Sequence, residues 1–95
     1  MTSKQRAMLR SMANTLDTIL YVGKDGVTEA IVKEAYDALN ARELIKACVQ
    51  PEAPCTAKEA LQELCEKLGA EPVQSIGRRF VMYRANEKNP RIVLE

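Results

Sequence analysis

Residues 18–29 have the sequence TILYVGKDGVTE, and this stretch decides the fold of the chain. Thr18–Val22 is a short β-branched and aromatic run that predicts a strand, and Gly23 ends it. The loop Gly23-Lys24-Asp25-Gly26 follows, and a helix is expected to begin near Thr28. Its buried stripe is formed by the apolar residues Val27, Ile31, Ala35, Ala38 and Leu39. A strand that passes through a short loop into a helix is typical of α/β proteins.

The segments on either side continue the alternation. Before the loop, Ser3–Leu16 predicts a helix with Ser3 as its N-cap. After it, Leu44–Val49 predicts a second strand, ended by a proline-containing loop. A capping box formed by Thr56 and Glu59 then predicts a third helix, which ends at Gly69.

The last third of the chain predicts a hairpin. Val73–Ile76 and Phe80–Arg84 read as two strands joined through Gly77-Arg78, and Arg91–Leu94 is a candidate last edge strand. The order helix, strand, helix, strand, helix, strand, strand predicts an α/β sandwich with a four-stranded mixed sheet and three helices. At 95 residues, we expect one domain over residues 1–95.

Composition narrows the class of protein. Hydrophobic residues make up 46% of the chain and charged residues 28%, which is typical of globular proteins. No apolar run approaches the roughly 18 residues of a membrane span, and the amino terminus has no signal-peptide core, so we expect a cytoplasmic protein without membrane partners. Three cysteines without zinc-site spacing predict reduced thiols, with Cys48 and Cys65 as small core residues.

Basic residues gather towards the two ends of the sequence. Residues 1–24 hold four basic residues and one acidic residue, and residues 76–91 hold five and one. The intervening residues 25–75 hold five basic and ten acidic residues. If folding brings the two ends together, one face of the protein becomes positive and suits a phosphate-rich partner.

The loop Gly23-Lys24-Asp25-Gly26 resembles the G-x-x-G loop of KH domains, in which glycines let a nucleic-acid backbone approach closely. The following helix amino terminus favours an anion, and Lys24 can contact a phosphate directly. Four residues are a weak motif, however, and a tight turn in which glycine supplies a positive φ explains them as well.

Three separated blocks give a more specific resemblance. Gly23-Lys24-Asp25-Gly26-Val27-Thr28-Glu29, Glu43-Leu44-Ile45-Lys46 and residues 76–84, IGRRFVMYR, together with Ser3-Lys4-Gln5-Arg6 at the first helix, resemble the YhbY family. This family is the single-domain bacterial form of the CRM domain, and the likeness runs in order from the first helix to Arg84.

The resemblance implies a fold related to the carboxy-terminal domain of translation initiation factor three. It also implies RNA binding during maturation of the large ribosomal subunit, with ribosomal RNA or the pre-large subunit as partner. The residues implied to contact RNA are the loop, the first helix and the last hairpin: Gly23, Lys24, Asp25, Gly26, Lys4, Arg6, Arg10, Arg78, Arg79 and Arg84. Ordinary solvated charges remain an alternative for Arg78 and Arg79, and an ordinary exposed helix face for Arg6 and Arg10.

Two other classes of function were compared with RNA binding. The chain has no histidine, serine-nucleophile motif, Walker loop or recognisable metal cluster, so we expect no catalysis, cofactor or small-molecule substrate. A protein-interaction adaptor is the alternative, because two helices in the middle of the chain carry many carboxylates. These are Glu29, Glu34, Asp37, Glu59, Glu63 and Glu66.

Overall fold

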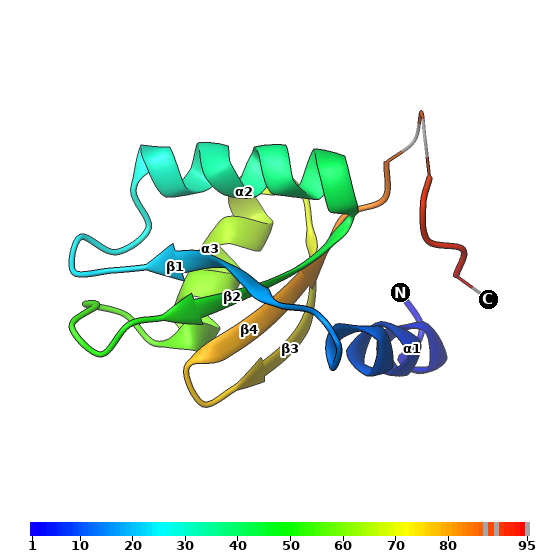
Figure 1. Ribbon diagram of the computed structural model, residues 1–95, viewed down its shortest axis with the longest axis horizontal. Coiled ribbons are helices and arrows are strands. Elements are labelled where there is room, and N and C mark those ends of the chain that lie inside the picture. Colours follow the sequence, from blue (N-terminus) through cyan, green and yellow to red (C-terminus); the bar gives the residue numbers. More distant parts are fainter. Residues whose placement is uncertain (87, 89, 95) are drawn as a thin grey trace.

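The computed structural model describes residues 1–86, 88 and 90–94, and its architecture is the predicted α/β sandwich. Three helices pack on a four-stranded sheet of order β1-β2-β4-β3 (Figure 1). Strands β1 and β2 are parallel, and β4 is antiparallel to both β2 and β3. The elements are α1 (Ser3–Ala13), β1 (Thr18–Val22), α2 (Glu29–Arg42), β2 (Leu44–Val49), α3 (Ala57–Leu68), β3 (Glu71–Ile76) and β4 (Arg79–Tyr83).

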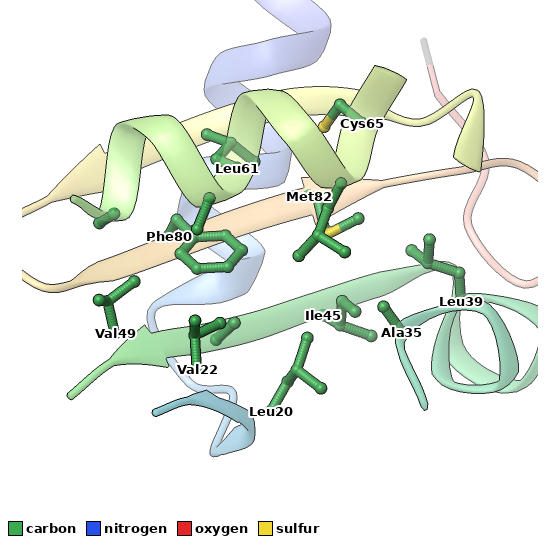
Figure 2. Packing of buried hydrophobic residues seen from close by; sticks show 14 residues of the cluster. Leu20, Val22, Ala35, Leu39, Ile45, Val49, Leu61, Cys65, Phe80 and Met82 are labelled. Carbon is green, nitrogen blue, oxygen red and sulfur yellow. The ribbon is translucent and has the colours of Figure 1, made fainter. Parts of the chain in front are cut away.

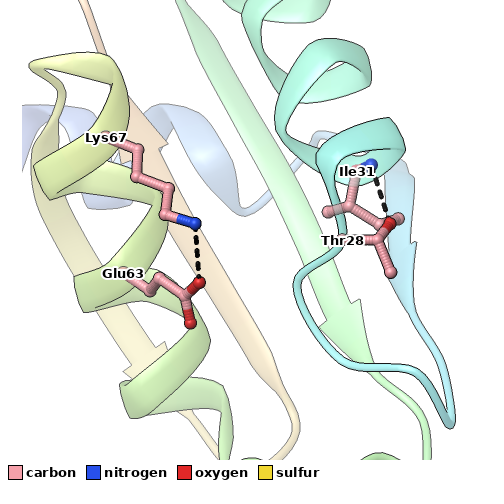
Figure 3. A network of polar contacts seen from close by, with 4 residues as sticks. All are labelled: Thr28, Ile31, Glu63 and Lys67. Carbon is pink, nitrogen blue, oxygen red and sulfur yellow. Dashed lines mark hydrogen bonds and ion pairs between the residues drawn. The ribbon is translucent and has the colours of Figure 1, made fainter.

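Local side-chain bonds fix where the helices begin. The predicted capping box of Thr56 and Glu59 is present at α3, and Gly69 ends that helix with φ +64°. At α2 the Thr28 hydroxyl accepts a bond of 3.2 Å from the Ile31 amide, as Figure 3 shows. Helix α1 differs from the prediction, because its N-cap is Thr2, and it ends at Ala13 rather than at Leu16.

Apolar side chains form two separate clusters, one on each face of the sheet. The larger cluster lies between the sheet and helices α2 and α3, with Phe80 and Met82 of β4 at its centre (Figure 2). The smaller one packs Leu9 and Ala13 of α1 on the other face, where Tyr83 of β4 points. Cys65 is buried in the larger cluster as predicted. Cys48 is only half-buried, so the prediction that it is a core residue is wrong.

The predicted last edge strand at Arg91–Leu94 is also wrong, because residues 90–94 form no strand. A buried carboxylate holds this segment instead. Glu43 is fully buried between α2 and β2 and has φ +65°. Its side chain accepts backbone N–H bonds from Asn86 at 2.6 Å, from Ile92 at 2.8 Å and from Arg91. The carboxylate thereby supplies the hydrogen-bond acceptors that a neighbouring strand would otherwise offer to the backbone of the C-terminal segment.

The environment of Glu43 sets its charge. Burial raises the pKa of this carboxyl, but the three backbone N–H groups and the nearby Arg91 guanidinium lower it. The net result is a pKa below the ordinary value of 4.5. Glu43 is therefore ionised at neutral pH. Its charge stabilises the folded state fully at pH values above the unfolded-state pKa, and this stabilisation is lost as the pH falls through the folded-state pKa.

Glu43→Gln should lower the free energy of unfolding at pH 7 by about 2 kcal/mol, because a neutral amide replaces the acceptor of three charge-assisted hydrogen bonds. Urea denaturation measures this, with exposed Glu34→Gln as the matched control. The difference between wild type and Glu43→Gln should shrink below pH 4.5, as the wild-type carboxyl takes up its proton. Equal stability of wild type and Glu43→Gln at pH 7 would contradict this role.

Candidate nucleic-acid interface

Strand register brings three loops to one end of the sheet. Val22, the last residue of β1, pairs with Val49, the last residue of β2. The Val49 amide then donates to the Arg78 carbonyl at 2.7 Å, and the Gln50 amide donates to Val22 at 2.9 Å. The glycine loop (residues 23–26), the loop after β2 (residues 50–55) and the β3–β4 hairpin (residues 77–78) therefore lie together, on the left of Figure 1. We call this region the loop end of the sheet.

The glycine loop is a tight turn that exposes a lysine. The Gly26 amide donates to the Gly23 carbonyl at 2.9 Å, which leaves Lys24 and Asp25 exposed at the tip of the turn. Gly26 has φ +71°, a backbone conformation that residues other than glycine rarely adopt. Helix α2 begins only at Glu29, and the Thr28 hydroxyl accepts a hydrogen bond from the Ile31 amide in its first turn. The loop therefore offers a phosphate the Lys24 ammonium rather than an uncapped helix end.

The glycines make room for a neighbouring loop of the protein, while their predicted contact with a nucleic-acid backbone stays a prediction. A Cβ at Gly26 would lie 3.2 Å from the ring of Pro54, and one at Gly23 would lie 3.0 Å from the side-chain oxygen of Gln50. Both neighbours belong to the loop after β2. The missing side chains allow two loops to pack closely, and this packing holds Lys24 outward.

Four of the predicted arginines lie on α1 and at the β3–β4 hairpin. Arg78 and Arg79 are exposed at the hairpin. Arg6 of α1 reaches a groove between α3 and β3 that Glu66 and Gln74 also line, and Asn14 lines a second groove with Gln74 and Arg79. Arg10 is exposed one helical turn after Arg6, on the same face of α1. Arg78 and Arg79 therefore lie at or beside the loop end, whereas Arg6 lies at the β3 edge of the sheet beside α3.

Two predicted residues do not join this group. Lys4 is exposed, and because it is two residues from Arg6 it points to another side of α1. Arg84 lies past the opposite end of β4, where its guanidinium donates to the Leu68 carbonyl at 3.0 Å and to the Asn40 side chain. Its Cζ also lies 4.9 Å from the centre of the Tyr36 ring. Arg84 joins β4 to α2 and α3 and is committed to the fold.

Sequence reasoning missed Lys46, which the sheet places on the α1 side. Lys46 pairs with Thr18 of β1 and with Val81 of β4, next to the groove that Asn14 and Arg79 line. The signal was present in the strand, because alternate residues of a strand face the same side. Lys46 and Cys48 interrupt the apolar run of β2 on one face only.

The cations at and near the loop end form no ion pair with the described residues. Among residues 1–86, 88 and 90–94, the ion pair found joins Lys67 to Glu63 at 3.1 Å on α3 (Figure 3). The Lys24, Lys46 and Arg79 side chains are therefore not neutralised by a carboxylate of the described chain. The exposed carboxylates of α2 and α3 lie on the other side of the sheet, so charge is distributed unevenly over the molecule.

Comparison with known proteins identifies the family. The sequence pattern of the CRS1 / YhbY (CRM) domain matches residues 1–84. The chain belongs to this family.

Similar proteins support the assignment over almost the whole length of the CRM domain. A Bacillus subtilis protein named "Probable RNA-binding protein YqeI" is 36% identical, with 99% of this chain and 98% of the relative covered. A Haemophilus influenzae protein named "RNA-binding protein" is 32% identical, with 93% and 89% covered. The solution structure of a Staphylococcus aureus protein, described as a candidate RNA-binding protein, matches with a TM-score of 0.83 and 39% identity, over 100% of this chain and 99% of that one.

The helices and the potential metal-binding side chains of the described part of this CRM domain bear on two other kinds of site. None of its helices has the length and hydropathy needed to cross a membrane. No cluster of three or more histidine, cysteine, aspartate or glutamate side chains that could hold a metal ion occurs within residues 1–86, 88 and 90–94.

Two glycine substitutions test the packing of the glycine loop. Gly77 also has a positive φ, +59°, but nothing lies within 4 Å of a Cβ built on it. Gly77→Ala should lower the free energy of unfolding by about 1 kcal/mol through backbone strain alone. Gly26→Ala should cost roughly 1 kcal/mol more, because its methyl group also meets Pro54. If urea denaturation shows that both variants lose the same free energy of unfolding, the contact with Pro54 does not contribute to the destabilisation of Gly26→Ala.

Proposed function

We propose that this CRM domain binds RNA in the cytoplasm through the glycine loop and the neighbouring basic surface. We further propose that its target is ribosomal RNA in pre-large-subunit particles during ribosome maturation. The observation that carries the proposal is the gathering of Lys24, Arg78 and Arg79 at the loop end of the sheet, where none of them forms an ion pair with a carboxylate of the described residues. The RNA-binding names of the relatives support the same class of ligand.

The charge distribution favours one direction of approach. A phosphate backbone is attracted to the side of the sheet that holds α1 and repelled by the exposed carboxylates of α2 and α3. Each phosphate neutralised releases condensed counterions, so affinity falls as salt rises. A surface that binds through a few exposed cations reads the shape of the backbone more than its sequence.

The loop geometry gives Lys24 a direct role. The turn from Gly23 to Gly26 places this side chain at an exposed tip, and the packing on Pro54 keeps the turn from collapsing. Arg78 lies in the adjacent hairpin, and its backbone carbonyl accepts a hydrogen bond from the Val49 amide of β2. Rigid strands thus hold both cations in place, and little ordering is needed when a phosphate backbone binds.

Lys24→Ala should weaken binding to ribosomal RNA without changing the thermal midpoint of unfolding, because the side chain is exposed. The slope of log affinity against log salt should fall by about 1, as expected when one phosphate contact is lost. Lys33→Ala is the matched control, because it removes an exposed lysine from α2. Mobility-shift assays at several salt concentrations measure both variants. Affinity that does not depend on salt would contradict the proposal and favour the adaptor alternative.

The ribosomal target is tested in cells. After sedimentation of a cell extract, the tagged protein should comigrate with precursors of the large subunit, and Lys24→Ala should move part of it to the top of the gradient. A wild-type protein found only at the top of the gradient would contradict a role in subunit maturation. The RNA-binding assays would still decide whether the protein binds RNA.

A further inference from the structure

Helix α1 covers only half of its face of the sheet. Its buried residues Leu9 and Ala13 pack on Leu44, Val81 and Tyr83, which lie towards the end of the sheet opposite the loop end. The grooves around Asn14 mark where the helix stops. Within the described residues, no helix therefore lies over the part of the sheet nearest the loop end on this side.

Strand register shows which residues this uncovered part contains. Tyr21 of β1 pairs with Cys48 of β2, Cys48 pairs with Arg79 of β4, and Arg79 pairs with Ile76 of β3. Partners at the same register point to the same face. We call Tyr21, Cys48, Arg79 and Ile76 the open row. It crosses all four strands, and at about 4.8 Å between strands it is about 14 Å long.

The side chains of the open row are accessible and chemically mixed. Tyr21 is 53% exposed and Ile76 is 64% exposed, both unusual for large apolar side chains on a sheet. The Tyr21 hydroxyl donates to the Thr18 carbonyl of its own strand at 3.4 Å, which lays the ring along β1. Arg79 is exposed in the same row.

Charge in and beside the open row has one sign. The next row of the sheet pairs Thr18, Lys46, Val81 and Gln74, so neither row contains a carboxylate. The nearest acidic residues along β1 are Asp17, before its first residue, and Asp25, in the glycine loop. A planar aromatic ring beside cations is the combination with which proteins hold single-stranded nucleic acid, because bases stack on the ring while phosphates bind the cations.

We propose that the open row is a platform for single-stranded RNA, on which one base stacks on Tyr21 while Arg79 and Lys46 bind the adjoining phosphates. This inference rests on the proposed RNA binding and specifies its ligand. An RNA duplex keeps its bases stacked inside the helix, so it cannot place one on the tyrosine. Tyr21 lies two residues before Gly23, so the platform continues directly into the glycine loop and Lys24.

The test compares two RNA probes of equal strand length, an eight-nucleotide single strand of uridine and a self-complementary eight-base-pair duplex. Tyr21→Ala should bind the single strand about tenfold more weakly, because one stacked base is lost. Its affinity for the duplex should not change. Tyr21→Phe, which keeps the ring, should bind the single strand within about twofold of wild type. Tyr36→Ala is the matched control, because Tyr36 is 47% exposed on α2, across the sheet from the open row.

A second measurement uses the wild-type protein, so it does not depend on the variants folding. Cys48 lies between Tyr21 and Arg79 in the open row and is a free, half-buried thiol. The single-stranded probe should slow alkylation of Cys48 severalfold, followed by mass spectrometry, whereas the duplex should leave its rate unchanged.

The outcomes separate the two proposals. If wild type binds the single strand, Lys24→Ala weakens binding, and neither Tyr21→Ala nor Cys48 alkylation shows an effect, the platform is wrong and the proposed function stands. If wild type binds neither probe, nor ribosomal RNA, at any salt concentration, both proposals fail. Equal weakening of single-strand and duplex binding in Tyr21→Ala would also overturn the platform, because a stacking contact must distinguish the two.

Discussion

The structure depends on how three helices are shared between two faces of one sheet. Helices α2 and α3 cover one face and enclose the larger apolar cluster. The other face has only α1, whose eleven residues make a helix about 16 Å long. One helix of that length covers only part of a four-stranded sheet. The sheet is therefore buried on this face at the end away from the loop end, and its burial stops near Asn14. The charged and aromatic residues of the α1 face gather where this coverage stops.

Two local constraints hold the ends of the sheet in the geometry that the proposals use. At one end the buried Glu43 carboxylate gathers backbone amides from three residues of the C-terminal segment and fixes the junction of α2 with β2. At the other end Gly26 adopts a positive φ against Pro54 and holds the glycine loop beside the loop after β2. Glu43 lies away from the proposed ligand and Gly26 lies within the loop proposed to bind it, and both residues position the elements around them.

The fold could be predicted from sequence because its signals are local. The run at Thr18–Val22, the capping box at Thr56 and the left-handed glycine at Gly69 each fix an element within a few residues. The error at Arg91–Leu94 arose because an apolar run next to a turn resembles a strand, while its real partner is a side chain distant in sequence. That contact could not be read from the residues of the run.

The candidate site was predictable only in part, for the same reason. Lys24 and the hairpin arginines are marked by their neighbouring glycines, whereas Arg84 was included as the end of the same sequence block and is held by Leu68 and Asn40. Lys46 and Tyr21 carry no motif and enter the site only through strand pairing. Which cations are free, and which face they share, follows from register and helix coverage rather than from spacing along the chain.

The most direct test of the account is an NMR titration of the isotope-labelled protein with single-stranded RNA. It predicts that backbone amide shifts concentrate in residues 21–26, 46–48 and 76–79, which meet at the loop end on the α1 side of the sheet. Shifts concentrated on the outward faces of α2 and α3, with residues 21–26 unchanged, would contradict it.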